Sequence, residues 1–324
     1  MKSVKVSLTQ TEHVHYRTRF VRDASPPMSC RFRFFLRVAP RHHRTCIIRR
    51  ADEYPGFPAR YGIYGSMIRA IVITGAASGI GQALALRYAR DGARLGLLDA
   101  NAAGLANVSE RCRALGADVY SHTIDVRERA ALGAWLAGFD DAQPIDILFA
   151  NAGVISGVAD GHSAESVDAS FELMDINVLG ILNTIHPLLP RMIARRRGTI
   201  AITSSVAGFA PLPQMPSYSA SKAAILSYGM SLRAGLRAHG VKVSVICPGY
   251  VNTPMAIRVQ GAKPFVRSVE YAAEKIHRGI ERNVPVIAFP WYFALVMRLG
   301  GLLPDRVRQH ALSVARFSVA PKQP

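Results

Sequence analysis

The chain has 324 residues, 49% of them hydrophobic, and a formal net charge of +18. This length and apolar content are enough for one large α/β domain with a full core, which excludes a chain that is disordered throughout. The positive charge is compatible with phosphates, acidic carriers or anionic lipid, but no pattern in the sequence points to specific nucleic-acid binding.

Residues 1–66 hold 13 Lys or Arg and 4 Asp or Glu and show no sustained periodicity of 2.0 or 3.6 residues. We interpret them as a basic, poorly ordered N-terminal extension. Three origins stay open: an upstream start ahead of Met67, a basic targeting segment, or an interaction tail. The segment is rich in arginine as organelle presequences are, but Pro26 and Pro27 interrupt any long amphipathic helix.

The first twenty residues lack the unbroken apolar stretch of a secretory leader. The four cysteines follow neither a CxxC pattern nor a Cys/His metal spacing; they are Cys30, Cys46, Cys112 and Cys247. We therefore expect no disulfide framework, no metal site and a reducing, cytoplasmic location.

Periodic structure begins at Met67, and apolar runs of strand length then alternate with helical patterns as far as residue 290. The predicted strands are 68–74, 94–99, 118–123, 145–150, 199–203, 241–246 and 284–289. The helices between them include a long stretch ending near Arg195 and another over 217–239. This alternation predicts an α/β catalytic domain over 67–290, a Rossmann-like doubly wound parallel sheet of about seven strands, flanked by helices on both faces.

The segment TGAASGIG, residues 74–81, lies where the first strand ends and a helix begins. Glycine there permits a tight turn, close approach of the backbone to a pyrophosphate, and close packing of the helix on the sheet. The helix N-terminus offers N–H groups and positive dipole charge to phosphates. We predict a dinucleotide site made of Gly75, Ser78, Gly79, Ile80 and Gly81. The alternative is a tight turn without a ligand.

Asp99 ends the second strand, 18 residues after Gly81. That is close to the ~20 residues expected before a carboxylate that binds the adenosine ribose hydroxyls. A carboxylate there repels the 2′-phosphate of NADP and no nearby cation compensates, so we expect NAD in preference to NADP. Capping of the next helix is the alternative role of Asp99.

Asp125 and Val126 follow the third strand and could border the adenine. The sequence DVRE over 125–128 also makes a capping box, and we give the capping role the larger weight.

Tyr218 and Lys222 are four residues apart on a predicted helix, so their side chains share one face. A free tyrosine, with a pKa of about 10, is a poor proton acceptor at neutral pH, whereas a neighbouring ammonium brings that pKa closer to 7. Taken alone, the pair also fits an exposed surface contact. Ser205 lies 13 residues before Tyr218 at the end of another strand, while Ser204 is interpreted as structural.

This combination resembles the short-chain dehydrogenase/reductase family over residues 67 to about 289. The motifs that carry the resemblance are the TGxxxGxG turn, Asn151-Ala152-Gly153, Asn177, Ser205, Tyr218, Lys222 and Pro248-Gly249. The resemblance implies an NAD(P)-dependent oxidoreductase that interconverts a secondary alcohol and a ketone or aldehyde by hydride transfer.

The same resemblance implies a role for each polar side chain. Tyr218 would be the general acid/base, and Lys222 would bind the nicotinamide ribose and lower the pKa of Tyr218. Ser205 would hydrogen-bond the substrate oxygen. Asn177 would organise the water of a proton relay, with an exposed helical asparagine as the alternative.

Two further segments would contact the cofactor. In this family the stretch matching Asn151, Ala152 and Gly153 lies beside the adenosine ribose and stabilises the central sheet, and the stretch matching Pro248, Gly249, Val251 and Thr253 faces the nicotinamide amide. Plain turns are the alternative for both segments. A small alcohol or carbonyl substrate would contact the mostly apolar segments 154–157, 206–216 and 250–263, and the short connection before residue 284 leaves little room for a lid.

Residues 291–324 are predicted to form an apolar and basic helical C-terminal tail. Prolines at 285 and 290 and glycines at 300 and 301 argue against a spanning helix nearby. The tail could touch a membrane surface peripherally, but packing against the domain or a second subunit is favoured. The family resemblance implies a homodimer or homotetramer.

Two other functions remain on the same fold: a catalytically silent dinucleotide sensor and a basic binding protein. The intact set Asn177, Ser205, Tyr218 and Lys222 favours the enzyme, because binding without chemistry does not need proton-transfer residues.

Overall fold

The computed structural model describes residues 5–7, 13–15, 68–304, 306–307 and 317–320. The chain divides into two units, Met1–Gly65 and Ser66–Pro324. In the first unit, strand β1 (Lys5–Ser7) pairs antiparallel with β2 (His13–His15). The rest of the basic extension, and with it the prediction that it is poorly ordered, lies outside the described residues.

The second unit is built on a parallel sheet of seven strands in the order β10-β8-β7-β6-β3-β4-β5. The strands are β3 (Ala70–Thr74), β4 (Arg94–Asp99), β5 (Asp118–Thr123), β6 (Ile147–Ala150), β7 (Thr199–Thr203), β8 (Lys242–Pro248) and β10 (Val286–Phe289). The chain adds β4 and β5 on one side of β3 and then returns to add β6 on the other. This confirms the predicted doubly wound sheet, and the reversal at β3 and β6 marks where such folds bind ligands.

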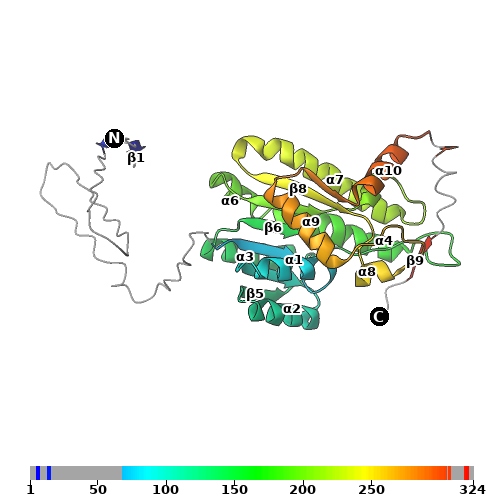
Figure 1. Cartoon of the computed structure of the whole chain (residues 1–324), viewed down its shortest axis with the longest axis horizontal. Helices are drawn as coiled ribbons and strands as arrows, with labels where there is room; N and C mark the ends of the chain where they lie inside the picture. Colours follow the sequence, from blue (N-terminus) through cyan, green and yellow to red (C-terminus); the bar gives the residue numbers. More distant parts are fainter. Residues whose placement is uncertain (1–4, 8–12, 16–67, 305, 308–316, 321–324) are drawn as a thin grey trace, which may run out of the picture. The chain divides into compact units, whose positions relative to one another are not determined.

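Helices cover both faces of this sheet (Figure 1). They are α1 (Gly79–Ala89), α2 (Ala102–Ala114), α3 (Arg129–Ala142), α4 (Val167–Met174), α5 (Gly180–Ile185), α6 (Leu189–Ala194), α7 (Pro216–Leu236), α8 (Pro254–Ile257), α9 (Val269–Glu281) and α10 (Trp291–Gly301). Buried residues of α1, α2 and α9 form a core on one face, and those of α3, α5, α6 and α7 form a core on the other. α1 and α9 lie side by side.

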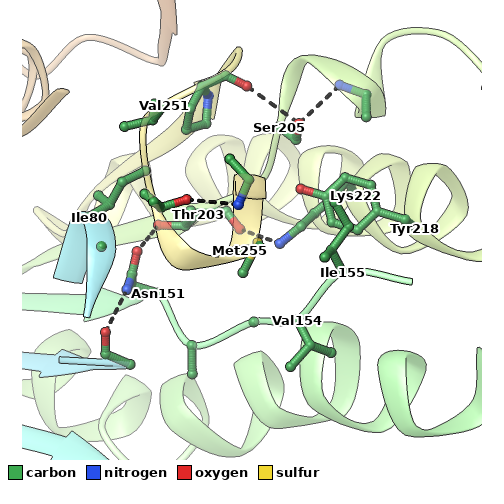
Figure 2. A pocket seen from close by; sticks show the side chains of 18 of the residues that line it. Ile80, Asn151, Val154, Ile155, Thr203, Ser205, Tyr218, Lys222, Val251 and Met255 are labelled. Atoms are coloured by element: carbon green, nitrogen blue, oxygen red, sulfur yellow. Dashed lines mark hydrogen bonds between the residues drawn. The ribbon is translucent and has the colours of Figure 1, made fainter. Parts of the chain in front are cut away.

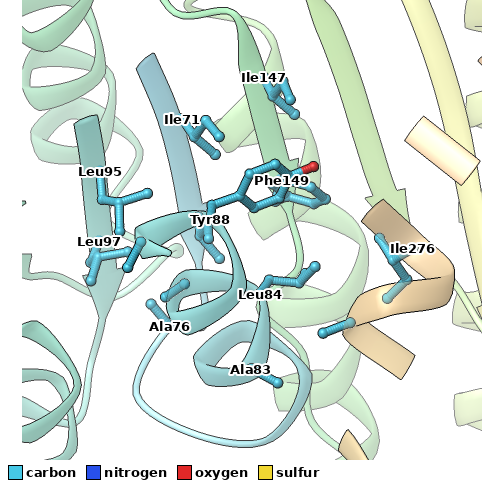
Figure 3. Packing of buried hydrophobic residues seen from close by; sticks show 14 of the residues in the cluster. Ile71, Ala76, Ala83, Leu84, Tyr88, Leu95, Leu97, Ile147, Phe149 and Ile276 are labelled. Carbon is cyan, nitrogen blue, oxygen red and sulfur yellow. The ribbon is translucent and has the colours of Figure 1, made fainter. Parts of the chain in front are cut away.

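The period of two along β3 divides its side chains between these cores. Ile71 belongs to the core under α1 and α9, and Val72 belongs to the core under α3 and α7. In the first core the ring of Tyr88 packs against Phe149 with 5.7 Å between ring centroids, and Ile276 of α9 lies nearby (Figure 3). Each such fully buried side chain stabilises the fold by about 1.5–3 kcal/mol.

The long helix predicted to end near Arg195 is divided in the structure. A π-helical turn, η2 (Asp175–Leu179), joins α4 to α5, and α6 follows. The pattern of apolar residues does not show this interruption, because a π turn inserts only one extra residue per turn. Short 3₁₀ turns, η3 (Val206–Gly208) and η4 (Arg237–His239), flank α7.

The C-terminal tail contains a strand as well as the predicted helix. β11 (Phe317–Val319) pairs antiparallel with β9 (Val259–Gly261). Three residues are too few for a strand period to be recognised in the sequence. The short connection before residue 284, which carries α8 (Pro254–Ile257) and β9, is thus joined by a strand from the C-terminal part of the chain.

Within the described ranges no helix has both the length and the apolar character needed to cross a membrane. Nor do three or more His, Cys, Asp or Glu side chains of this part of the chain gather as metal ligands would. Cys112 and Cys247 are buried free thiols, and Cys30 and Cys46 lie outside the described residues.

Candidate active site

A cavity of about 750 Å³ opens at the carboxyl ends of the central strands. Loops that follow β3, β6, β7 and β8 meet there with the end of β4. The predicted site residues that line it are Gly75, Ser78, Gly79, Ile80, Gly81, Asp99, Asp125, Val126, Asn151, Ala152, Gly153, Ser205, Tyr218, Lys222, Pro248, Gly249, Val251 and Thr253. Asn177 alone of the predicted set does not line the cavity.

The glycine turn between β3 and α1 forms one end of this cavity. Gly75 and Gly79 have φ values of +69° and +55°, which favour glycine. A Cβ on Gly81 would lie 2.0 Å from the carbonyl oxygen of Gly75, so only glycine lets α1 begin this close to the turn. The side chain of Ser78, the N-cap residue, makes no capping hydrogen bond. The first turn of α1 lines the cavity and presents the positive end of the helix dipole to it.

The carboxylate of Asp99 is fixed at the end of β4 by two backbone N–H groups. Its Oδ2 accepts from Ala77 N at 2.9 Å, and its Oδ1 accepts from Asn101 N at 2.9 Å. The cap of α2 is instead Asn101, whose Oδ1 accepts from Gly104 N at 3.0 Å. Asp99 therefore does not serve as the helix cap and borders the cavity with an ordered carboxylate.

The predicted capping of α3 by Asp125 is wrong, because the N-cap of this helix is Glu128, which makes no side-chain cap hydrogen bond. Asp125 instead forms its hydrogen bonds within the turn before α3. It accepts from Arg127 N at 2.9 Å, and its own N–H donates to Glu128 Oε1 at 3.3 Å. The Arg127 guanidinium binds the same carboxylate at 2.6 Å and also borders the cavity. The position of Arg127 at the cavity could not be predicted from the sequence, because no local pattern indicates the direction of its side chain.

Asn151 holds the central strands together below the cavity. Its Nδ2 donates to Thr74 O at 3.1 Å, and its Oδ1 accepts from Thr203 Oγ1 at 3.0 Å. Its backbone N–H donates to Thr74 Oγ1 at 3.1 Å. Figure 2 shows Asn151 between the neighbouring strands. The side chain thus ties the ends of β3 and β7 to the loop after β6, which agrees with a role in stabilising the central sheet.

Tyr218 and Ser205 line the same cavity, and Ser205 lies near enough to influence the pKa of the Tyr218 phenol. Ser205 caps η3 by accepting from Ala207 N at 3.1 Å and donates to Pro248 O at 3.4 Å. Burial raises the pKa of Tyr218 to about 12, and the nearby Ser205 hydroxyl lowers it only in part. This hydroxyl pair is protonated at neutral pH.

Lys222 lies beside Tyr218 but points its ammonium group at β7. Its Nζ donates to Thr203 O at 3.2 Å and lies 5.6 Å from the centre of the Tyr218 ring (Figure 2). Burial lowers the pKa of Lys222 to about 8. The spacing of the two residues in the sequence predicts that this ammonium lowers the pKa of Tyr218. In the structure that expectation fails, because desolvation dominates both groups.

Asn177 is fully buried in the π turn η2, so the alternative of an exposed helical asparagine is wrong. Its Oδ1 accepts from Val154 N at 2.8 Å, and its Nδ2 donates to Val154 O at 2.9 Å and to Ser221 Oγ at 3.2 Å. The side chain links the loop after β6 to α7 immediately before Lys222. Asn177 therefore does not line the cavity but fixes the position of two segments that do.

One wall of the cavity is apolar. Its lining comes from the three predicted segments, with Val154, Ile155, Val206, Ala207, Leu212, Met215, Tyr250, Met255, Ala256, Val259 and Ala262. Pro264 and two residues of α10, Phe293 and Met297, complete this wall. The sequence did not predict that these two α10 residues line the cavity, because their position depends on where α10 begins after β10. None of these lining side chains is charged.

Comparison with known proteins agrees with this geometry. The family model for short chain dehydrogenases matches residues 69–264. An uncharacterized oxidoreductase of Myxococcus xanthus is 33% identical over 242 residues, covering 73% of this chain and 93% of the relative.

Two solved structures have the same architecture. A short-chain dehydrogenase/reductase from Burkholderia phymatum in complex with NAD has a TM-score of 0.65 and 26% identity, covering 79% of this chain and 98% of that one. A short-chain dehydrogenase from Sphingobium yanoikuyae in complex with NADPH has a TM-score of 0.64 and 26% identity, covering 77% and 97%. The match over most of the second unit, together with the motifs gathered in the cavity, shows that the chain belongs to the short-chain dehydrogenase family of oxidoreductases.

Proposed function

We propose that the chain is an NAD-dependent dehydrogenase/reductase that interconverts a secondary alcohol and the corresponding ketone, or an aldehyde and its alcohol. The observation that carries the proposal is that Tyr218, Ser205 and Lys222 line one cavity together with the glycine turn. Proton-transfer groups and a phosphate-binding turn in a single cavity are what a dinucleotide oxidoreductase requires.

The residues at the glycine end fit a nicotinamide dinucleotide. The first turn of α1 would hold the pyrophosphate. This turn lies so close to the glycine turn that a Cβ on Gly81 would clash with the Gly75 carbonyl oxygen. Asp99 would bind the adenosine ribose, with Asp125, Val126 and the 151–153 loop beside the adenosine. Lys222 would bind the nicotinamide ribose, and the loop from Pro248 to Thr253 the nicotinamide amide. When bound, the nicotinamide accepts or donates the hydride.

The proton must move in step with that hydride. In the direction of carbonyl reduction, the Tyr218 hydroxyl would donate its proton to the carbonyl oxygen. In alcohol oxidation, the deprotonated Tyr218 oxygen would accept the proton of the alcohol, so the raised pKa favours the reduction direction at neutral pH. The Ser205 hydroxyl would hydrogen-bond the same substrate oxygen and stabilise the charge that develops there. The raised pKa of Tyr218 keeps its proton available for reduction. Asn177 would contribute to the proton relay from its place behind Lys222.

The preference for NAD is supported by the charges at the adenosine end. The ordered Asp99 carboxylate disfavours a 2′-phosphate nearby. The Arg127 guanidinium is a cation that could offset this repulsion. It is bound to the Asp125 carboxylate, which neutralises its charge. The related structures include both an NAD complex and an NADPH complex, so the proposal depends on these side chains of the chain itself.

A homodimer or homotetramer is supported by exposed apolar side chains on α4, η2 and α7, three elements that contact one another. Val167 and Phe171 of α4 are each 69% exposed, and Leu179 of η2 and Met230 of α7 are exposed as well. Exposed apolar patches of this kind often mark subunit contacts.

The outer face of α10 also carries exposed apolar side chains, Trp291, Leu295 and Leu299 among them. It supports either the favoured packing against a second subunit or the alternative of peripheral membrane contact. Cytoplasmic location stays a prediction from the sequence.

The test is turnover by the purified full-length chain with a panel of secondary alcohols, ketones and aldehydes, each with NAD(H) and NADP(H). We expect activity on uncharged apolar compounds, with a kcat/KM for NAD(H) at least about tenfold above that for NADP(H). A preference for NADP(H) would contradict the role of Asp99. Tight dinucleotide binding without turnover on any member of the panel would favour the silent sensor instead.

A further inference from the structure

The C-terminal strand β11 is joined to the apolar wall of the cavity by backbone hydrogen bonds. It pairs with β9 from Phe317 opposite Gly261 to Val319 opposite Val259. Val319 N also donates to Val158 O at 3.1 Å, and Ala320 N donates to Arg258 O at 2.8 Å. β11 is therefore bonded both to β9 and to the loop after β6.

The side chain of Val319 is 2% exposed and packs in a small apolar cluster with Ile155, Met215 and Val259. These three partners line the cavity, whereas Val319 lies behind them. Gly157 makes room for this contact, because a Cβ there would lie 2.5 Å from Cγ2 of Val319. Val319 thus supports the cavity wall from outside.

Arg258 joins the same segments through its guanidinium. Its Nε donates to Ala320 O at 3.1 Å, and one terminal nitrogen donates to Ile155 O at 3.0 Å. A planar guanidinium can hold two carbonyl oxygens in fixed directions, which an ammonium group cannot do. The side chain therefore fixes the spacing between the C-terminal strand and the loop that carries Ile155.

We propose that β11 is a strap that fixes the apolar wall of the substrate cavity, with Val319 and Arg258 as positioning residues that determine how large an apolar substituent the enzyme accepts. The proposal rests on the proposed carbonyl-reducing function and deepens it. The substrate class it implies is an uncharged ketone or alcohol with a bulky apolar group, because the wall that the strap holds consists of Ile155, Met215 and Val259 and bears no charge. Loosening the strap would remove contacts from a large substituent and leave a small one unaffected.

The test compares Val319→Ala and Arg258→Met with the wild type in the full chain. Reduction of methyl ketones from 2-butanone to 2-dodecanone is measured with saturating reduced cofactor. We expect kcat/KM for 2-dodecanone to fall by about tenfold and that for 2-butanone to change by less than about twofold. Val307→Ala, the same substitution at a position that is 52% exposed, is the matched control and should leave the whole series unchanged.

An equal fall for every ketone would show a general structural role and overturn the proposal, as would an unchanged series. The proposed function fails separately if the wild type turns over no alcohol, ketone or aldehyde of the panel. If the wild type reduces none of the methyl ketones, binding of the neutral dye Nile red to the cavity takes the place of turnover. The strap then predicts about tenfold weaker dye binding in both variants, together with faster amide hydrogen exchange in residues 154–158 and 259–261. Wild-type dye affinity and exchange in the variants would overturn it.

Discussion

Tyr218 shows how its surroundings change the chemistry of a single side chain. In the sequence it is a tyrosine four residues before a lysine, and that spacing suggests a lowered pKa. In the structure burial raises the pKa of the phenol to about 12, while the Lys222 ammonium donates to the Thr203 carbonyl. The spacing correctly indicated that the two side chains are neighbours. It could not show that burial outweighs the nearby ammonium in setting the pKa of Tyr218.

Removing the Tyr218 hydroxyl tests the proton transfer directly. Tyr218→Phe keeps the ring but leaves nothing to exchange a proton with the substrate oxygen. We expect kcat/KM to fall by about 10²- to 10⁴-fold, with the dissociation constant of NADH, measured by fluorescence, nearly unchanged. Tyr120→Phe changes a tyrosine that is 49% exposed on β5 and should keep full activity. Turnover at the wild-type rate in Tyr218→Phe would remove this residue from the mechanism.

Lys222 provides a prediction on stability and pH. Burial lowers its pKa to about 8 from the ordinary lysine value of 10.5. Between these two values the unfolded chain binds more protons at this residue than the folded chain, so its contribution to stability rises with pH. From pH 8 to pH 10 we expect the free energy of unfolding of the wild type to gain about 2 kcal/mol relative to Lys222→Met.

Urea unfolding of both proteins at the two pH values measures this difference, and the other titrating groups largely cancel in the comparison. Parallel pH profiles would mean that Lys222 keeps an ordinary pKa in the folded protein.

At the scale of elements, the glycine turn, the start of α1 and the π turn position the site. The turn could be predicted because three glycines at a strand-to-helix junction have a local cause, steric crowding. The π turn that carries Asn177 could not be predicted, since its hydrogen bonds to Val154 and Ser221 join residues that are 23 and 44 positions away.

Gly81→Ala tests the close approach of α1 to the turn. The added Cβ would lie 2.0 Å from a backbone oxygen, so the first turn of α1 must shift. We expect the KM for the cofactor to rise at least about tenfold and stability to fall by about 1–3 kcal/mol. Gly138→Ala in α3 has nothing within 4 Å of its new Cβ and should leave KM unchanged and stability equal or higher. Similar KM values in the two variants would contradict the assignment of the turn to the cofactor.

On the scale of the whole molecule, the sheet order brings together loops that are more than 170 positions apart in the chain, from Gly75 to Thr253. Cavity-lining residues in the described part of the chain run from Gly75 to Met297. The seven-stranded sheet and both of its cores likewise lie within the second unit.

We therefore expect a chain that begins at Met67 to keep dehydrogenase activity. Its kcat/KM should lie within about twofold of the full-length value, and its Tm should be similar, because no contact of the described cavity would be lost. Both are measured on the two purified chains side by side. A folded but inactive shortened chain would point to the alternative in which the basic extension carries the function.

The family, the strand and helix order and most of the cavity lining follow from local patterns, since strand periods, glycine turns and the i, i+4 spacing have causes within a few residues. Asp99 and the Tyr218-Lys222 pair belong to this group. Folding alone decides the protonation of Tyr218, the side-chain partners of Asn177, the wall formed by α10 and the strap formed by β11. These features depend on burial and on contacts between segments far apart in the chain, so they cannot be predicted from any short stretch of the sequence.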